Sequence, residues 1–260
     1  MKSRKTALIT GASSGIGLEL ARVFAKNQID LVITARSEGK LAEIKKELEQ
    51  DHGIRVKIIP ANLSEYENAE DIYRIIKEKN IEVEYLVNNA GFGDYGNFHE
   101  SDWTKQEAMI NLNITSLTYL THLFLKDMVR RKCGRILNVA STAAFQPGPL
   151  LSVYYATKAF VLHFSEAIAN ELQGTGITVT TLCPGPTQSS FADTANMGNS
   201  ALFKRKLPTS REVAEYGFKA MIAGKTVAIH GTQNKILRQA GRFAPRKVMT
   251  AIVRKIQEAR

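Results

Sequence analysis

The sequence SVYYATKAF places two adjacent tyrosines one helical turn before a lysine. Residues three or four apart share a helix face, so the ammonium of Lys158 can reach the phenol of either Tyr154 or Tyr155 and stabilise its phenolate. A tyrosine held in this way can exchange protons with a bound substrate. The spacing alone leaves the choice between the two tyrosines open. Tyr73 and Lys77 in the polar segment DIYRIIKEK repeat it, and there we expect an exposed helix pair.

A glycine-rich turn follows the first apolar run of the chain. In TGASSGIG the glycines stand between a run that begins at Thr6 and a helical pattern that begins near Ile16. Glycine lets the backbone turn tightly and approach a pyrophosphate, and the first amides of the helix supply unpaired donors. The alternative is a turn that merely joins a strand to a helix. We predict a dinucleotide phosphate site, with contacts from Gly11, Ser13, Ser14, Gly15, Ile16 and Gly17.

A single arginine ends the second apolar run. Arg36 lies in the segment ITARS, nineteen residues beyond Gly17. A carboxylate at such a strand end would accept hydrogen bonds from the ribose 2′-hydroxyl of NAD, whereas a guanidinium pairs with the 2′-phosphate of NADP. The position therefore predicts NADP as the cofactor, against the alternative of an ordinary surface arginine.

Polar residues also end the fourth and fifth apolar runs. Asn88 and Asn89 close VEYLVNN, and Ser141 closes NVAS thirteen residues before Tyr154. Buried amides need several hydrogen-bond partners, so the two asparagines either tie neighbouring strands together or face a polar ligand.

These residues need elements that bring them together, and the chain alternates short apolar runs with helical-period segments. The runs predict strands from Thr6, Asp30, Val56, Val83, Arg135, Ile177 and Thr226. The helical segments cover 16–27, 39–51, 65–79, 102–131, 153–173 and 210–223. Such alternation predicts an α/β fold: a Rossmann-like, doubly wound parallel sheet of about seven strands flanked by helices on both faces. Ligands of such sheets bind beyond the carboxyl ends of the strands, where these polar residues stand.

Length and composition fit one globular domain over residues 1–260 and exclude disordered and fibrous chains, since 44% of residues are hydrophobic and 23% charged. The basic N-terminal segment reads as a strand rather than a signal peptide, and no segment has the roughly 20 apolar residues of a membrane span. Cys133 and Cys183 have no metal-ligand or CxxC spacing, and no metal is expected. This pattern predicts a reduced, cytoplasmic protein.

The positive charge is concentrated near the C-terminus. Residues 235–260 hold eight Lys/Arg and one Glu, a contribution of +7 to the net charge of +10. After Pro245, one helical face is apolar and the opposite face basic: Val248, Met249, Ile252, Val253 and Ile256 against Arg246, Lys247, Arg254 and Lys255. We expect a basic helical extension docked on its own domain or on a sister subunit. The alternatives are contact with anionic lipid, and an acidic partner or acyl carrier. No nucleic acid is expected, because aromatic residues do not interleave with the basic ones.

Taken together, TGASSGIG, NNAG, Ser141, YYATK and PGPTQS resemble the short-chain dehydrogenase/reductase family from about Thr6 to Ile229. The resemblance implies that Tyr154, which opens the YxxxK motif, is the catalytic tyrosine, with Ser141 and Lys158 as its catalytic partners. The fourth catalytic residue is an asparagine in a long helix. Asn113 in LNITS matches it better than Asn111, although Ser116 replaces the glycine of the family pattern.

The same resemblance implies the remaining cofactor contacts. Asn62 stands where family members often have an aspartate near the adenine, and its amide can still donate and accept. Ser189 keeps the hydroxyl of the family's PGxxxT segment. The lysine is expected to bind the nicotinamide ribose. The further cofactor-binding residues are Leu63, Asn89, Ala90, Gly91, Pro184, Gly185 and Thr187, together with Tyr154 and Lys158.

The implied reaction is hydride transfer between the nicotinamide and a carbonyl or alcohol carbon, with Tyr154 as the acid or base. An ammonium about 4 Å away contributes roughly 4 kcal/mol at an effective dielectric of about 20, enough to bring a phenol close to neutrality. Ser141 would donate a hydrogen bond to the developing alkoxide, and Asn113 would hold a water that relays protons toward Lys158.

The substrate end is expected to be apolar. Residues 187–208 would form a lid, with Phe191, Met197, Leu202 and Phe203 facing Phe92 and residues 146–151. A hydrophobic ketone or aldehyde is the predicted substrate, and a 3-oxoacyl thioester is the alternative. A cofactor-binding sensor without catalysis would normally lack part of the serine, tyrosine and lysine set. Family resemblance implies a homodimer or homotetramer built on the helices over 102–131 and 153–173.

Overall fold

The computed structural model describes residues 4–189, 191–195, 207–241 and 243–258. Its centre is a seven-stranded sheet in which every neighbouring pair of strands is parallel. The order is β3 (Val56–Ile58), β2 (Asp30–Thr34), β1 (Thr6–Thr10), β4 (Val83–Asn88), β5 (Gly134–Val139), β6 (Ile177–Cys183) and β7 (Val227–Ile229). The predicted doubly wound parallel sheet is confirmed. The strand order reverses direction between β1 and β4, and such a reversal opens a crevice at the carboxyl ends of the strands.

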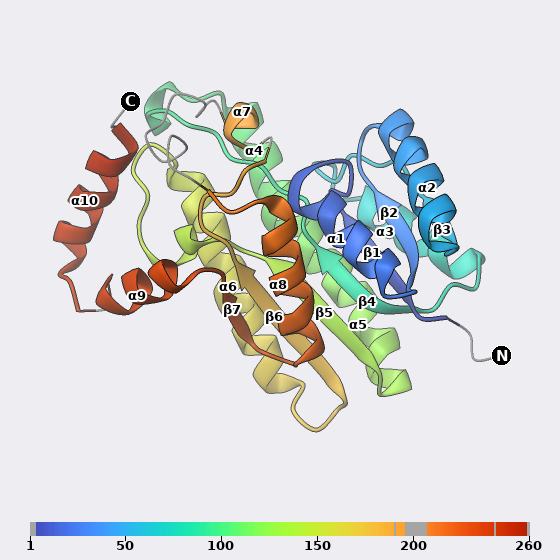
Figure 1. Cartoon of the computed structure of the whole chain (residues 1–260). Helices are drawn as coiled ribbons and strands as arrows, with labels where there is room; N and C mark the ends of the chain where they lie inside the picture. The colour runs from blue at the N-terminus through green and yellow to red at the C-terminus, as the bar shows by residue number, and fades with distance from the viewer. Residues whose placement is uncertain (1–3, 190, 196–206, 242, 259–260) are drawn as a thin grey trace.

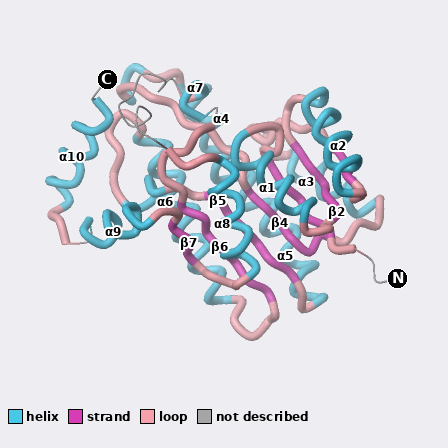
Figure 2. The backbone as a smooth tube through the Cα atoms, viewed as in Figure 1, coloured by secondary structure: helices cyan, strands magenta, loops and turns pink. Residues whose placement is uncertain are grey.

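Helices cover both faces of the sheet (Figures 1 and 2). One layer contains α1 (Gly15–Lys26), α2 (Glu38–His52) and α8 (Ser210–Ile222). The other contains α3 (Asn68–Glu78), α4 (Trp103–Ile110), α5 (Leu117–Arg131) and α6 (Ser152–Glu171). The two helical layers shield the buried strands from water on both sides.

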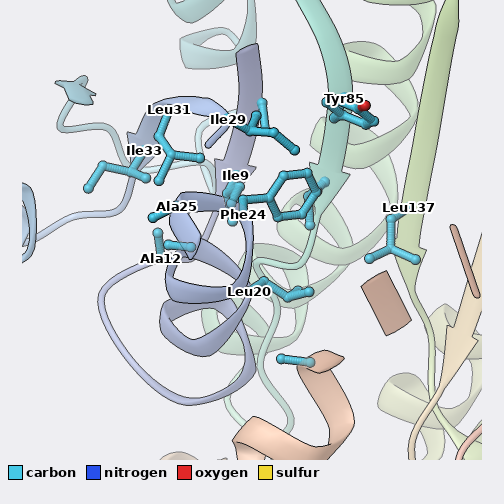
Figure 3. Packing of buried hydrophobic residues seen from close by; sticks show 14 of the residues in the cluster. Ile9, Ala12, Leu20, Phe24, Ala25, Ile29, Leu31, Ile33, Tyr85 and Leu137 are labelled. Atoms are coloured by element: carbon cyan, nitrogen blue, oxygen red, sulfur yellow. The ribbon is translucent and has the colours of Figure 1, made fainter. Parts of the chain in front are cut away.

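Each helical layer has its own apolar core, because successive side chains of a strand point to opposite faces. Ala7 and Ile9 of β1 pack toward α1, whereas Leu8 between them packs toward α3 and α5. Phe24 is the centre of the first core and meets Tyr85 edge-to-face at a ring distance of 5.5 Å (Figure 3). These contacts pack α1 against the sheet.

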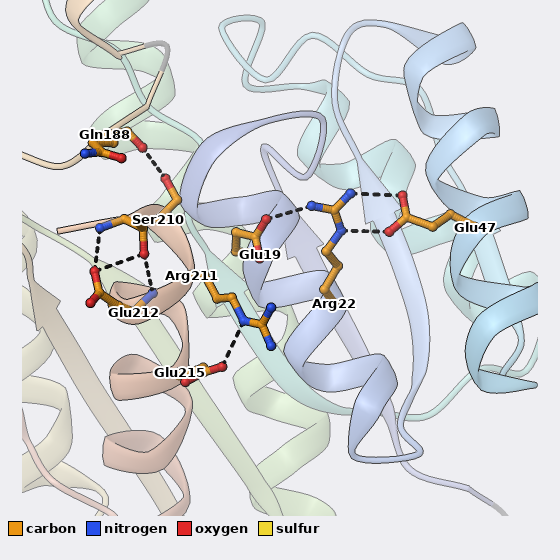
Figure 4. Close-up of polar contacts among 9 residues, drawn as sticks. Glu19, Arg22, Glu47, Gln188, Ser210, Arg211, Glu212 and Glu215 are labelled. Atoms are coloured by element: carbon orange, nitrogen blue, oxygen red, sulfur yellow. Dashed lines mark hydrogen bonds and ion pairs between the residues drawn. The ribbon is translucent and has the colours of Figure 1, made fainter.

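Ion pairs and hydrogen bonds join neighbouring helices on the α1 face (Figure 4). Arg22 of α1 binds Glu19 at 2.7 Å and, through two nitrogens, Glu47 of α2 at 2.7 and 3.0 Å. Ser210 at the start of α8 donates to the backbone oxygen of Gln188 at 2.8 Å. The helices that border the crevice are therefore tied to each other and to the segment after β6.

The helical segment predicted over 102–131 is present from Trp103 to Arg131, but it is not α-helical throughout. A π-helical turn, η2 (Asn111–Ser116), separates α4 from α5. Asn113 and Ser116 on this turn are both 1% exposed and point their polar side chains inward. A wider turn re-aims side chains that an uninterrupted α-helix would place elsewhere, and such turns concentrate at functional sites.

The predicted exposed pair on α3 also differs from expectation. Tyr73 is partly buried, and its hydroxyl donates to Asp127 of α5 at 2.9 Å. Lys77 binds the same carboxylate at 3.0 Å. This tyrosine and lysine therefore join two helices and lie outside the crevice.

Three short or peripheral helices complete the fold. α7 (Phe191–Thr194) follows β6, while α9 (Thr232–Gly241) and α10 (Arg246–Glu258) form the C-terminal segment. The periodicity after Pro245 anticipated α10, but α9 was not predicted. Among the described residues no helix is long and apolar enough to cross a bilayer, and no cluster of His, Cys, Asp and Glu has the makings of a metal site. Both cysteines are free, Cys133 exposed and Cys183 buried.

Candidate active site

A cleft of about 550 Å³ opens at the carboxyl ends of the strands, where the fold predicts a ligand. Its walls come from the segments that follow β1, β2, β3, β4, β5 and β6, and from the start of α6. Most of the residues predicted from sequence line it: Gly11, Ser13, Ser14, Gly15, Ile16, Arg36, Asn62, Leu63, Asn89, Ala90, Gly91, Ser141, Tyr154, Lys158, Pro184, Gly185, Thr187 and Ser189. Gly17 and Asn113 lie behind the cleft wall.

The turn after β1 requires glycine at three positions. Gly11 and Gly15 have φ values of +66° and +55°, which side chains other than glycine rarely adopt. A Cβ on Gly17 would lie only 2.2 Å from the carbonyl oxygen of Gly11. The absence of a side chain at Gly17 therefore lets the turn pack closely against the start of α1. The first turn of α1 faces the cleft with unpaired backbone amides, the donor arrangement that binds phosphate.

Thr10 and Asn89 hold this turn against the end of β4. The Thr10 hydroxyl accepts from the backbone amides of Asn89 and Ala90, each at 3.0 Å. The Asn89 side chain donates to the carbonyl oxygens of Thr10 at 3.0 Å and Gly11 at 3.3 Å. One side chain from each strand end therefore fixes the backbone of the other.

Asn88 lies deeper and serves the sheet itself. Its side-chain nitrogen donates to Thr121 of α5 at 3.0 Å and to the side chain of Asn138 of β5 at 2.9 Å. Asn138 in turn donates to Ser165 of α6 at 2.9 Å. Of the two roles open for the asparagine pair, Asn88 ties neighbouring elements together, and Asn89 both ties strand ends and lines the cleft.

The end of β2 carries two cations. Arg36 is exposed and lines the cleft with Ser37, the N-cap of α2, and with Lys40 in the first turn of that helix. Neither cation forms an ion pair with the residues that the structure describes. An anionic group at this corner of the cleft would meet two positive side chains and the N-terminus of a helix.

Asn62 is committed partly to its own turn. Its side-chain nitrogen donates to Glu65 at 2.9 Å, and its side-chain oxygen accepts from the amide of Ser64 at 3.3 Å. One amide hydrogen and one oxygen lone pair stay available for a ligand. Leu63 beside it is buried, and its carbonyl oxygen accepts from Ser116 of the π-helical turn at 2.5 Å.

Ser141, Tyr154 and Lys158 meet in one part of the cleft. Ser141 lies within hydrogen-bonding reach of Tyr154, and its hydroxyl donates to the carbonyl oxygen of Pro184 at 3.4 Å and accepts from the amide of Ala143 at 3.1 Å. The Lys158 ammonium lies 5.8 Å from the centre of the Tyr154 ring and donates to the carbonyl oxygen of Val139 at 2.8 Å. Three elements, namely the end of β5, the turn η3 (Thr142–Phe145) and α6, deliver these groups to one place.

The electrostatics of this group differ from the sequence expectation. Burial raises the pKa of Tyr154 above its ordinary value, and the hydrogen bond with Ser141 lowers it only in part. Burial also lowers the pKa of the Lys158 ammonium to about 8. The expected fall of the Tyr154 pKa toward neutrality is therefore absent in the cofactor-free chain. Its cause is desolvation, which is the largest influence on the pKa of this phenol.

Asn113 supports the catalytic group from behind. Its side-chain nitrogen donates to the carbonyl oxygen of Phe92 and to Thr157, each at 3.0 Å, and its oxygen accepts from the amide of Phe92 at 3.2 Å. Both donors are thus in use. A Cβ on Gly91 would lie 3.0 Å from this oxygen and 3.3 Å from the Lys158 nitrogen, so glycine keeps the space between them open.

Tyr155, the second tyrosine of the pair, has other partners. Its ring packs against Gly148, where a Cβ would come within 2.1 Å of it. Its hydroxyl accepts from the side chain of Gln257 on α10 at 2.8 Å, and the backbone oxygen of Gln257 accepts from the Tyr95 hydroxyl at 3.2 Å. Burial raises the pKa of Tyr155 to about 12, because the amide of Gln257 offsets little of the desolvation.

Apolar side chains close the substrate end. Phe191 of α7 lies 5.1 Å from the Tyr154 ring and packs with Tyr95 and Leu151. Phe92, Leu151 and Phe191 line the cleft, as predicted from the sequence. Met197, Leu202 and Phe203, also expected in the lid, lie outside the described residues.

The segment after β6 forms the remaining wall. Pro184, Gly185, Thr187 and Ser189 line the cleft, and Thr187 is buried, with its hydroxyl donating to Gly185 at 2.9 Å. Backbone bonding of Gln188 to Pro208 at 3.0 Å carries this segment toward α8.

Sequence reasoning missed three residues of the site. Lys40 follows Arg36 by four positions at the start of a helix, a spacing that could have flagged it. Thr10 is the last residue of β1, and its hydroxyl could have been recognised as the partner of a neighbouring strand end. Gln257 carries no local signal, because its contacts are 102 and 162 residues away in sequence.

The cleft fits a phosphorylated dinucleotide. A glycine-rich turn leads into the N-terminus of α1, and two cations lie at the end of β2. Gly11, Gly15 and the first amides of α1 would hold the pyrophosphate, while Arg36 and Lys40 would hold a ribose 2′-phosphate. Lys158 and Tyr154 lie at the opposite end, where a nicotinamide ribose would lie.

Comparison with known proteins gives the same picture. The sequence pattern described as short chain dehydrogenase matches residues 5–199. A short-chain dehydrogenase from Sphingobium yanoikuyae, solved in complex with NADPH, superposes with a TM-score of 0.81 at 28% identity, covering 98% of both chains.

Two curated relatives have stated activities. The ketoacyl reductase of Nostoc is 31% identical over 251 residues, which is 94% of this chain and 86% of the relative. The 17-beta-hydroxysteroid dehydrogenase type 3 of Mus musculus is 39% identical over 182 residues, or 68% of this chain. The matched region spans only 58% of the mouse protein.

Proposed function

The chain belongs to the short-chain dehydrogenase family of oxidoreductases acting on CH–OH groups, and we propose that it is an NADP(H)-dependent reductase of hydrophobic ketones or aldehydes. The observation that carries the proposal is the meeting of Ser141, Tyr154 and Lys158 beside an apolar pocket, at the far end of a cleft with a basic corner. A sensor that only binds cofactor would have no need of the complete set.

Tyr154 is the proton donor. Because burial raises its pKa, the phenol keeps its proton at neutral pH and is ready to give it to a carbonyl oxygen as negative charge develops there. The hydride for the carbonyl carbon would come from NADPH held in the cleft.

Ser141 and Lys158 would stabilise the negative charges that develop during the reaction. The Ser141 hydroxyl, already bonded to Tyr154, would donate to the same substrate oxygen and lower the barrier to its becoming anionic. Lys158 places a positive charge beneath the Tyr154 ring and stabilises the phenolate that remains once the proton is given. With the donors of Asn113 committed to Phe92 and Thr157, the predicted water relay would have to use the remaining lone pair of its oxygen or a backbone group of η2.

The cofactor preference rests on the cations at the end of β2. A 2′-phosphate carries close to two negative charges, and Arg36 and Lys40 have no acidic partner among the described residues. NAD lacks this phosphate and would leave both charges unused. This difference supports NADP over NAD.

The substrate class rests on the apolar end. Phe92, Leu151 and Phe191 would surround the carbonyl substituents, and Tyr155 would lie beside them. A 3-oxoacyl thioester is the second candidate, because the similarity to the Nostoc ketoacyl reductase runs over nearly the whole chain. The cytoplasmic location and the homodimer or homotetramer stay predictions.

Steady-state oxidation of NADPH against hydrophobic ketones, aldehydes and 3-oxoacyl thioesters tests the proposal. We expect kcat/KM with NADPH at least tenfold above that with NADH, and highest with a bulky ketone or aldehyde. Turnover of thioesters alone would favour the second candidate, and a preference for NADH would refute the cofactor assignment.

The tyrosine pair gives the matched control. Tyr154→Phe should lower kcat by about 10²- to 10⁴-fold while NADPH still binds, as loss of a general acid does. Tyr155→Phe should stay within about tenfold of the parent. The reverse ranking would assign the chemistry to Tyr155.

A further inference from the structure

The C-terminal helices α9 and α10 expose large apolar side chains to solvent. Six such residues are 46–83% exposed, half of the exposed large hydrophobics in the described chain: Ile236, Leu237, Phe243, Val248, Ile252 and Ile256. A concentration of exposed large apolar side chains on two consecutive helices is typical of an interaction surface. In Figure 1 both helices lie at the edge of the molecule, away from α1 and α2.

α10 has two separate apolar faces. Val253 and Gln257, four residues apart, turn inward and are 4% and 1% exposed. Val248, Ile252 and Ile256, also four apart, form a second stripe that is 46–49% exposed. The apolar face, expected from sequence to dock on the domain or on a sister subunit, is thus divided, and only its inner part docks on the domain. Gln257 docks the helix through its bonds with Tyr155 and Tyr95.

α9 repeats this division. Arg238 turns inward, with its guanidinium 5.0 Å from the centre of the Phe145 ring, and Asn234 donates to the backbone oxygen of His230 at 2.8 Å. Ile236 and Leu237 point away and are 63% and 59% exposed. Phe243, in the turn to α10, is 83% exposed. Both helices therefore turn exposed apolar side chains away from the domain.

Positive charge borders the apolar stripe. Lys247, Arg254 and Lys255 are exposed on α10, and Arg254 pairs with Glu258 at 2.6 Å. Lys247 and Lys255 make no ion pair with any described residue. Six basic residues and one acidic residue belong to the described part of 235–260: Lys235, Arg238, Arg246, Lys247, Arg254 and Lys255 against Glu258.

We propose that the outward surface of α9 and α10, defined by the six exposed apolar residues and the flanking Lys247, Arg254 and Lys255, binds the surface of an anionic lipid bilayer. Apolar side chains at helical spacing would enter the boundary between headgroups and acyl chains, and the lysines would meet anionic headgroups. The inner face would stay on the domain.

Charge favours a bilayer over a second copy of the chain. A two-fold contact through this surface would face each basic segment with its own copy, because such a contact is self-complementary. Like charges would then meet across the apolar stripe. An anionic bilayer offers both the apolar layer and the opposite charge. The proposal does not depend on the substrate or cofactor of the cleft.

Co-sedimentation of the 260-residue chain with vesicles tests this. We expect binding to vesicles of phosphatidylserine and phosphatidylcholine, weak binding to phosphatidylcholine alone, and release by high salt. Ile252→Glu/Ile256→Glu should abolish binding. Lys247→Gln/Lys255→Gln should weaken it about tenfold or more, because each basic residue near an anionic surface contributes.

Control variants change exposed apolar and basic residues that lie outside α9 and α10. Ile222→Glu alters another exposed apolar residue, and Lys26→Gln/Lys46→Gln removes two exposed lysines from α1 and α2; both should bind like the parent. The thermal midpoint of each variant checks folding. Equal sedimentation with both vesicle types, equal binding by the stripe variants, or a stripe variant that loses only self-association in light scattering would overturn the proposal.

Discussion

The two ends of the cleft are built in different ways. The cofactor end is made of backbone turns at strand ends, fixed by buried hydrogen bonds such as those of Thr10 and Asn89. The substrate end is made of side chains from α7, α10 and the loop before α6, joined by ring contacts and by the single side chain of Gln257. The first end lies within the sheet core, whereas the second is attached to it from outside.

This difference separates what the fold determines from what it leaves adjustable. Substitutions at the cofactor end affect closely packed backbone, because hydrogen bonds tie the two strand ends to each other there. Changes at the substrate end strike side chains on peripheral elements, which can repack. Substitutions should therefore reduce stability and binding strongly at the cofactor end and only slightly at the substrate end.

Gly17→Ala is expected to disturb the cofactor end most strongly. The new Cβ would lie 2.2 Å from the carbonyl oxygen of Gly11 and 2.4 Å from the side-chain nitrogen of Asn89, so the turn must shift. Overpacking of this kind costs about 1–3 kcal/mol, or roughly 3–10 °C of thermal midpoint in a chain of this size. We also expect NADPH affinity to fall more than tenfold in fluorescence titration.

Gly39→Ala is the matched control for this glycine. A Cβ on Gly39 of α2 meets nothing within 4 Å, and alanine has the higher helix propensity. Its thermal midpoint should stay level or rise slightly, with normal NADPH binding. If both alanines behave alike, the tight turn is not what limits the cofactor end.

Arg36→Ala tests the basic corner. Loss of a charge-assisted bond costs about 1.5–3 kcal/mol, so the KM for NADPH should rise about tenfold to a hundredfold. The KM for NADH should stay within twofold, because NADH has no phosphate at this corner. Equal losses with both cofactors in steady-state assays would show that Arg36 supports the fold rather than the 2′-phosphate.

The sequence predicted the cofactor end better than the substrate end, for the same physical reason. Gly11, Asn89 and Ser141 stand directly after apolar runs, so local pattern locates them at the sheet edge. The strands themselves were predicted because burial on both faces leaves an apolar run in the sequence. Local rules suffice where the backbone carries the function.

The remainder depends on contacts that no local pattern contains. The π-helical turn at Asn113 interrupts a continuous helical period, so periodicity predicted one long helix. Gln257 reaches Tyr155 from 102 residues away, and the raised pKa of Tyr154 reflects burial by the whole fold. Helical period after Pro245 located α10 but could not tell which half of its apolar face would dock.

The buried ammonium of Lys158 lowers the stability of the folded chain. Burial lowers the pKa of its ammonium from 10.5 to about 8, so between these pH values the unfolded chain binds more protons and stability rises with pH. Below about pH 8 the buried charge costs the folded state about 3 kcal/mol. Lys158→Met removes this cost but also the bond to Val139, worth about 1 kcal/mol, for a net gain of about 2 kcal/mol.

Thermal unfolding of the cofactor-free chain checks this sign. Lys158→Met should melt about 4–8 °C above the parent at pH 7, and the gap should close as the pH approaches 10.5. Lys46→Met, which alters an exposed lysine on α2, should show no gap that changes with pH. A gap for Lys158→Met that widens between pH 7 and 10 would contradict a buried ammonium.

Gln257→Leu makes the smallest change, at the substrate end. It removes the bond to Tyr155 and leaves that buried hydroxyl unpaired, which costs about 1–3 kcal/mol locally. The peripheral helix can adjust, so we expect the KM of the carbonyl substrate to rise about threefold to tenfold, with kcat and the KM for NADPH within twofold. Tyr155→Phe removes the other half of the same bond, so Gln257→Leu/Tyr155→Phe should be less impaired than the sum of the two single changes. Strict additivity in this cycle, or a matching rise in the KM for NADPH, would show that α10 does not act on the substrate end through this bond.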